Sequence, residues 1–138
     1  MAGRLSLASP HAYSSRLRHV LVVSRFRVPE PEGERFRIDL EAAHDVLSTR
    51  TGFVEGRIGR NLDDPTLWVL TTTWENVGAY RRALSSYEVK LGAVPLLSRA
   101  IDEPSAYEPV ERGVGLDRLD RRGTDADRRG TDSTRSIG

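Results

Sequence analysis

The apolar residues in the middle of this chain switch repeatedly between a strand spacing and a helix spacing. Their order limits the possible folds more than any other feature. Residues 19–28 are rich in β-branched side chains and are followed by Pro29 and Pro31, which is typical of a strand. Over residues 33–49 the spacing becomes helical. One stripe of that helix would consist of Phe36, Leu40, Ala43 and Leu47. Thr51-Gly52 is expected to end the helix.

A hairpin is expected next. Residues 53–62 and 66–75 have the composition of strands, and Asp63-Asp64-Pro65 between them is typical of a turn. In the second of these strands both alternating sets of side chains are moderately apolar. We therefore expect both faces of the sheet to be covered, one of them by helices.

A helical region and a short strand complete the core. Asn76 can cap a first helix, and Ser85 with Glu88 has the spacing of a capping box that would begin a second. Pro95 must kink or restart that second helix, because proline removes a backbone hydrogen bond. A last strand is expected within residues 105–110.

The resulting order, β-α-β-β-α-β, defines an α+β fold of the ferredoxin-like type. Helices cover only one sheet face in this arrangement, so a half-apolar face would remain bare on a small domain. Pairing two sheets face to face across a two-fold axis would cover it. The order of elements therefore also predicts a homodimer.

Composition excludes several functional classes. The chain has 138 residues and a net charge of +1, which argues against a strongly basic nucleic-acid-binding protein. It has no cysteine, so disulfides and thiolate metal sites are excluded, and no metal site is expected. No apolar run approaches the roughly 20 residues that span a bilayer, so no membrane association is expected. With one lysine among 21 basic residues, the chain resembles products of GC-rich bacterial genomes.

The two ends of the chain differ from its core. Residues 1–17 carry arginines and no acid, and they lack the continuous apolar stretch of a secretory signal. We expect a disordered arm there and a cytoplasmic protein. Residues 111–138 contain Asp-Arg-Arg-Gly-Thr-Asp twice, starting at Asp120 and at Asp127. This tail has too few apolar residues to offset its ordering entropy and is expected to be disordered. The folded domain is therefore expected to span residues 18–110.

The segment Trp74-Glu75-Asn76-Val77-Gly78-Ala79-Tyr80 resembles the Trp-Glu-x-x-x-Ala-Tyr/Phe signature of the antibiotic biosynthesis monooxygenase family. Leu67-Trp68-Val69-Leu70 and Thr51-Gly52-Phe53 also match the family pattern, and the resemblance covers about residues 18–108. It implies a dimeric α+β barrel. It also implies oxidation of an aromatic polyketide by dioxygen without metal, flavin or haem.

The resemblance implies catalytic roles for Trp74 and Tyr80, both of which can donate hydrogen bonds to a developing enolate. An aromatic-lined pocket would bind a flat phenolic ring. The residues expected to bind the substrate are Ser24, Phe26, His44, Trp68, Tyr87 and Leu91. The alternative is that Trp74 and Tyr80 are simply part of the core, and that His44 has only a structural role.

Other proteins of this fold degrade haem with an Asn, a Trp and a His. The corresponding positions in this chain are Ser24, Ala83 and Ala93, so the haem-site residues are missing and no cofactor is expected. An RNA-recognition role is also disfavoured, because residues 20–23 offer no exposed aromatic on a central strand. Two hypotheses remain, a cofactor-independent monooxygenase and a non-catalytic small-molecule binder or structural dimer.

Overall fold

Four antiparallel strands form one sheet in the computed structural model, which describes residues 19–116. The predicted N-terminal arm and the repeated part of the predicted tail lie outside these residues. Residues 111–116, the first part of that tail, are described and contain a turn in which the Val114 N–H donates to the Glu111 carbonyl. The elements in chain order are β1 (Val20–Arg27), η1 (Glu30–Glu32), α3 (Gly33–Ser48), β2 (Phe53–Arg60), β3 (Leu67–Trp74), α4 (Val77–Ser85), α5 (Tyr87–Gly92), α6 (Val94–Leu97) and β4 (Ala106–Tyr107). This order confirms the predicted α+β, ferredoxin-like arrangement.

The strands lie in the order β2-β3-β1-β4, so the first strand of the chain lies near the middle of the sheet. In the antiparallel register of β1 and β3, Val20 lies opposite Trp74, Val22 opposite Thr72 and Phe26 opposite Trp68. Residues directly opposite each other share a face. These six side chains are all buried, and they form the side of the sheet that faces the helices.

The core lies between this sheet face and α3. The four residues of the predicted helical stripe are all buried: Phe36, Leu40, Ala43 and Leu47. Phe36 packs between Phe26 of β1 and Trp68 of β3, with ring centroids 5.2 and 5.5 Å away. The stripe therefore determines which side of α3 meets the sheet.

The turn between α3 and β2 requires a glycine. Gly52 has a φ of 93°, which side-chain-bearing residues rarely adopt. A Cβ at this position would also lie 2.4 Å from the Cβ of Ala79 in α4. The helix itself ends earlier than expected, at Ser48, with Thr49 as its C-cap. Gly52 thus allows the turn to lie close to α4, where a residue with a side chain would collide with Ala79.

The helices after β3 are shorter than their apolar stripe predicts. Asn76 caps α4 as expected, accepting a hydrogen bond from the Ala79 N–H at 2.8 Å. The cap of α5 is Ser86, which accepts from the Val89 N–H, and the prediction of Ser85 was wrong. Ser85 instead donates to the backbone carbonyl of Arg81 within α4.

Pro95 restarts the helix as expected. A new helix, α6, begins at Val94 directly after Ala93, and Pro95 lies in its first turn. The buried residues just before this restart also differ from the expected stripe. Val89 and Ala93 are fully buried, whereas Leu91, expected on the apolar stripe, is 63% exposed. The last strand, β4, is limited to Ala106 and Tyr107 and lies between Pro104 and Pro109, which cannot donate to a strand ladder.

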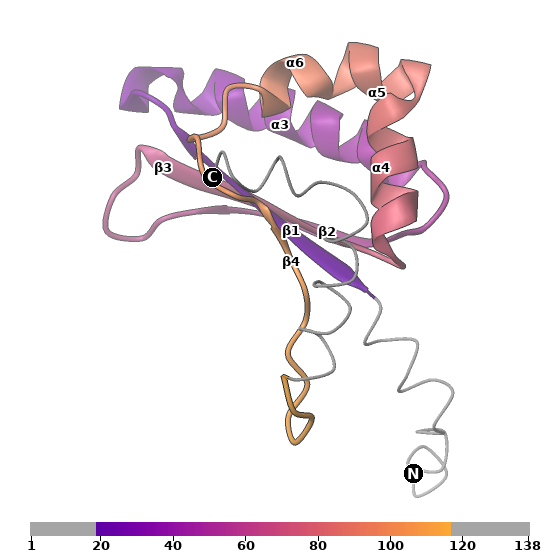
Figure 1. Ribbon diagram of the computed structural model, residues 1–138. Coiled ribbons are helices and arrows are strands. Elements are labelled where there is room, and N and C mark those ends of the chain that lie inside the picture. Colours follow the sequence, from indigo (N-terminus) through magenta and orange to yellow (C-terminus); the bar gives the residue numbers. More distant parts are fainter. Residues whose placement is uncertain (1–18, 117–138) are drawn as a thin grey trace, which may run out of the picture.

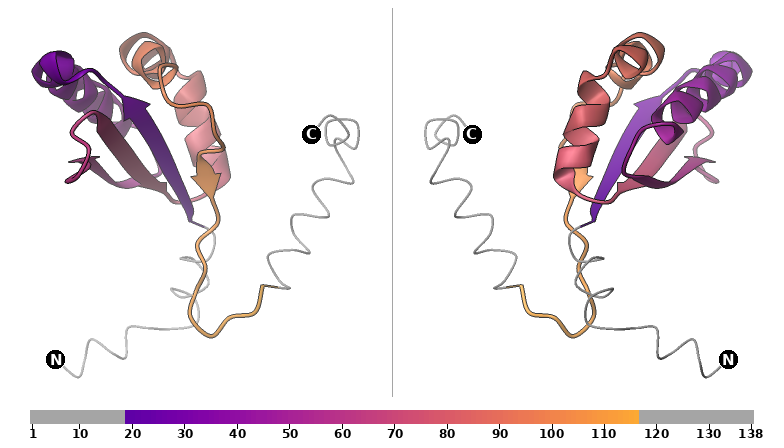
Figure 2. Two further views of the ribbon diagram at one scale, coloured as in Figure 1. Left: turned by 90° about the vertical axis from the view of Figure 1, so that its left-hand side faces the viewer. Right: turned by 90° about the vertical axis from the view of Figure 1, so that its right-hand side faces the viewer.

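All helices of the described region lie on one side of the sheet (Figures 1 and 2). No described element covers the opposite face, where Leu21 is 37% exposed and lies opposite Thr73 of β3. The expectation that both faces are covered therefore holds for only one face within residues 19–116. None of the helices in this range is long and apolar enough to cross a membrane.

Candidate functional site

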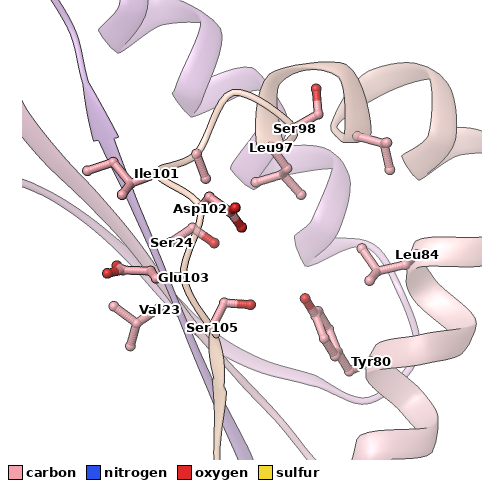
Figure 3. Close-up of a pocket in the computed structure, with 12 residues that line it drawn as sticks. Val23, Ser24, Tyr80, Leu84, Leu97, Ser98, Ile101, Asp102, Glu103 and Ser105 are labelled. Carbon is pink, nitrogen blue, oxygen red and sulfur yellow. The ribbon is translucent and has the colours of Figure 1, made fainter. Parts of the chain in front are cut away.

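A cavity of about 600 Å³ opens between the β1–β4 edge of the sheet and the helices α4 and α6 (Figure 3). Its lining comes from five places in the chain: β1, α4, α6, the segment that follows α6, and the residue before β4. The lining residues are Val23, Ser24, Tyr80, Leu84, Val94, Leu97, Ser98, Ala100, Ile101, Asp102, Glu103 and Ser105. The volume falls within the range of small-molecule sites in proteins.

Tyr80 provides the aromatic side of this cavity. Its ring is half-buried, and its hydroxyl points into the open space on the same side as the Ser105 hydroxyl (Figure 3). Burial raises the pKa of Tyr80 above its ordinary value, and the hydrogen bond with the Ser105 side chain lowers it by a smaller amount. Tyrosine is already neutral near pH 7 at its ordinary pKa of about 10, and the upward shift leaves it so, so the Tyr80 hydroxyl can donate a hydrogen bond to a ligand.

The segment after α6 is held along β1 on both sides of the cavity. The Ile101 N–H donates to the Arg25 carbonyl at 2.7 Å, and the Val23 N–H donates to the Ser105 carbonyl at 2.8 Å. The Arg25 guanidinium also binds the Glu103 carboxylate through two hydrogen bonds of 2.7 and 2.9 Å. These hydrogen bonds lower the pKa of Glu103. The segment is thus a fixed wall of the cavity.

Asp102 lies on this wall and was missed by the sequence analysis. It lines the cavity, and Figure 3 shows its carboxylate directed into the open space next to Ser24. No ion pair or hydrogen bond engages its side chain within residues 19–116, whereas the neighbouring Glu103 is paired with Arg25. No sequence signal marked it, because one acid in a polar stretch after a helix is typical of an ordinary loop.

Trp74 does not line the cavity. It is completely buried, and its indole N–H donates to the Thr72 hydroxyl at 2.9 Å. Its ring lies between Phe53 of β2 and Tyr80, at centroid distances of 5.2 and 5.7 Å. Trp74 therefore supports the Tyr80 ring from the core side.

Of the other residues expected to bind a substrate, only Ser24 reaches the cavity. Phe26 and Trp68 are buried against Phe36, and the indole N–H of Trp68 has no hydrogen-bond partner among the described residues. His44 contacts Phe53 and lies against Gly56, both on β2. Since β2 is the sheet edge opposite β4, His44 lies away from the cavity.

Two further residues of the predicted set lie on the outside of the helices. Tyr87 is 73% exposed, and Leu91 is exposed beside a shallower groove next to Pro95 and Arg99. Neither contributes to the lining of the cavity beside Tyr80. The structure therefore brings together Ser24 and Tyr80, supported by Trp74, and adds Asp102, Ser98 and Ser105.

The described residues contain no group of three or more His, Asp or Glu side chains that could hold a metal ion. The positions that correspond to haem-site residues are also without metal-binding side chains: Ser24 lines the cavity, and Ala83 and Ala93 are buried. The polar side chains among the lining residues carry only hydroxyl or carboxylate groups, and the others are apolar, so the cavity suits an organic ligand with hydrogen-bonding groups.

The chain is thus a small α+β protein with a cavity between a ferredoxin-like sheet and its helices. The family model described as "Antibiotic biosynthesis monooxygenase" matches residues 19–93, which is more than half of the chain. The chain belongs to this family.

Solved structures show the same fold. SnoaB, a cofactor-independent oxygenase from Streptomyces nogalater, has 21% sequence identity and a TM-score of 0.61 over 71% of this chain and 99% of that chain. A conserved protein from Methanosarcina mazei Go1 has 18% identity and a TM-score of 0.60 over the same shares of the two chains. No curated protein matches the chain. At these identities the similarity to solved structures concerns the fold.

Proposed function

We propose that this protein is a cofactor-independent monooxygenase that oxidises an aromatic, polyketide-type small molecule with dioxygen. The observation that carries the proposal is the Tyr80 hydroxyl, which faces a cavity large enough for a flat aromatic ligand. Family membership supports it, and so does the fold shared with SnoaB, a cofactor-independent oxygenase. The apolar side chains of Leu84, Val94 and Leu97 on the helix side suit an aromatic ring.

The reaction requires a substrate that supplies its own electrons. Loss of a proton from an anthrone gives an enolate, which reduces dioxygen; one oxygen atom enters the quinone product and the other leaves as water. The neutral Tyr80 hydroxyl can donate a hydrogen bond to the enolate oxygen as negative charge develops there. In this scheme Trp74 acts as a positioning residue, because it touches Tyr80 and does not line the cavity.

We also propose that two copies of the chain pair through the sheet face that no described element covers. Leu21, Val54 and Tyr107 are exposed large apolar residues on three different strands of this small sheet. Burying such residues against a second copy would stabilise a small domain. Sedimentation at micromolar concentration should give about twice the chain mass of 15.4 kDa. A species of single-chain mass at every concentration would contradict pairing.

Oxygen uptake tests the proposed reaction. The purified protein should consume dioxygen in the presence of anthrone and a metal chelator. Tyr80→Phe keeps the ring and removes only the hydroxyl, so the rate should fall by roughly ten- to a thousand-fold while folding is preserved. Tyr87→Phe is the matched control, because the same change on an exposed tyrosine outside the cavity should leave the rate unchanged. An unchanged rate in Tyr80→Phe would remove Tyr80 from the chemistry.

One observation favours the second candidate, a non-catalytic binder of small molecules. The indole N–H of Trp74 is satisfied by Thr72 in the core, so this residue donates nothing to a ligand in the cavity. If anthrone quenches the tryptophan fluorescence of the protein without any oxygen uptake, the binding function replaces the oxygenase.

A further inference from the structure

We propose that Asp102 is the general base that removes the substrate proton in this cavity, an inference that rests on the proposed function. A base of this kind must lie within hydrogen-bonding reach of the proton that it takes, and a carboxylate can serve. Asp102 contributes a carboxylate to the cavity lining that has no partner within residues 19–116.

The surroundings of Asp102 separate it from the other acid on the same wall. The Glu103 carboxylate is neutralised by two hydrogen bonds from Arg25, and Figure 3 shows it directed away from the cavity. The backbone on both sides of Asp102 is fixed to β1 through Ile101 and Ser105. The Asp102 side chain is exposed to the open cavity, and the fixed backbone restricts the space that its carboxylate can reach, which favours the positioning that general-base catalysis requires.

Tyr80 and Asp102 face the cavity from different elements, α4 and the segment after α6 (Figure 3). This placement suits an anthrone, in which the acidic methylene and the carbonyl oxygen lie at opposite ends of the central ring. The Asp102 carboxylate takes the methylene proton, and the C–H electron pair remains on the substrate. The negative charge then moves to the oxygen, where the Tyr80 hydroxyl donates its hydrogen bond.

Proton removal can be measured without oxygen chemistry. Under argon in deuterated buffer, the wild-type protein should exchange the methylene protons of anthrone faster than buffer alone, as followed by proton NMR. Asp102→Asn, which keeps the shape and removes the base, should lose about a hundred-fold or more of this acceleration. Asp102→Glu, which keeps a carboxylate, should retain part of it. Asp63→Asn, the same change in the exposed turn between β2 and β3, should exchange like the wild type.

Quenching of tryptophan fluorescence should show that Asp102→Asn still binds anthrone, so that a lost rate does not reflect lost binding. Exchange at the wild-type rate in Asp102→Asn overturns the proposal. If the wild type exchanges protons under argon, Asp102→Asn loses this exchange and the wild type takes up no oxygen, the oxygenase function fails while the role of Asp102 stands. If Asp102→Asn takes up oxygen as fast as the wild type, Asp102 is not the base and the oxygenase function stands. A wild type that neither exchanges protons nor takes up oxygen overturns both.

Discussion

Trp74 and Tyr80 come from one short motif and their rings are in contact, yet they lie in opposite environments. Trp74 ends β3 on the inner face of the sheet, is completely buried, and has its N–H satisfied by Thr72. Tyr80 lies on α4, is only half-buried, and directs its hydroxyl into a cavity. The first belongs to the core and the second to the candidate site.

The difference arises from the element that carries each residue. Between them the chain leaves the sheet and enters a helix capped by Asn76, whose alanines at positions 79 and 83 pack into the core. Because these alanines are small, α4 can lie close to the sheet. Tyr80, the neighbour of Ala79, lines the cavity at the β1–β4 edge. Contact between two aromatic rings thus does not give them the same role.

The comparison predicts first that truncating Trp74 affects stability most. Trp74→Ala would leave a large cavity beneath Phe53 and Tyr80, and should reduce the free energy of unfolding by about 3–5 kcal/mol. Urea denaturation followed by circular dichroism measures the loss. Tyr87→Ala, on an exposed tyrosine, should change it by no more than about 0.5 kcal/mol. If Trp74→Ala lost no more unfolding free energy than Tyr87→Ala, Trp74 would not be the core residue that the comparison with Tyr80 makes it.

A smaller effect is expected from removing the hydrogen-bond partner of Trp74. Thr72→Val keeps the shape of the side chain but leaves the buried indole N–H without an acceptor, which should cost about 1–3 kcal/mol of unfolding free energy. Because Thr72 does not line the cavity, the oxygen uptake of the folded variant should remain at the wild-type level. A variant of full stability would show that the hydrogen bond contributes nothing.

The smallest effect on stability is expected at the cavity. Ser105→Ala removes the hydrogen bond that lowers the pKa of Tyr80, so the pKa should rise further above its ordinary value. Because the pKa of Tyr80 is higher in the folded state than its value of about 10 in the unfolded state, protonated Tyr80 favours folding below that pH. This contribution to stability is lost as the pH rises through the folded-state pKa. The tyrosinate absorbance of Tyr80, obtained by difference from Tyr80→Phe, should therefore appear at higher pH in Ser105→Ala. A shift to lower pH would contradict the hydrogen bond.

Local patterns in the sequence were sufficient to predict most of the fold. The stripe of α3, the strand composition of β1 and the cap at Asn76 each depend on neighbouring residues, and each appears in the structure as predicted. The predictions that were wrong concern competition between neighbours. Ser86 rather than Ser85 caps α5, and Leu91 is exposed because Val89 and Ala93, four residues apart, occupy the buried positions.

The candidate site depended on contacts between distant parts of the chain. That Trp74 and Tyr80 lie near each other follows from the sequence alone, because only five residues, among them the helix cap Asn76, stand between them. That Tyr80 faces a cavity and that Asp102 lies on its wall follows instead from how distant segments pack together. That wall exists because Ile101 and Ser105 hydrogen-bond to β1, about eighty residues earlier in the chain. No periodicity encodes a contact of that kind, since it depends on how the whole sheet and its helices pack.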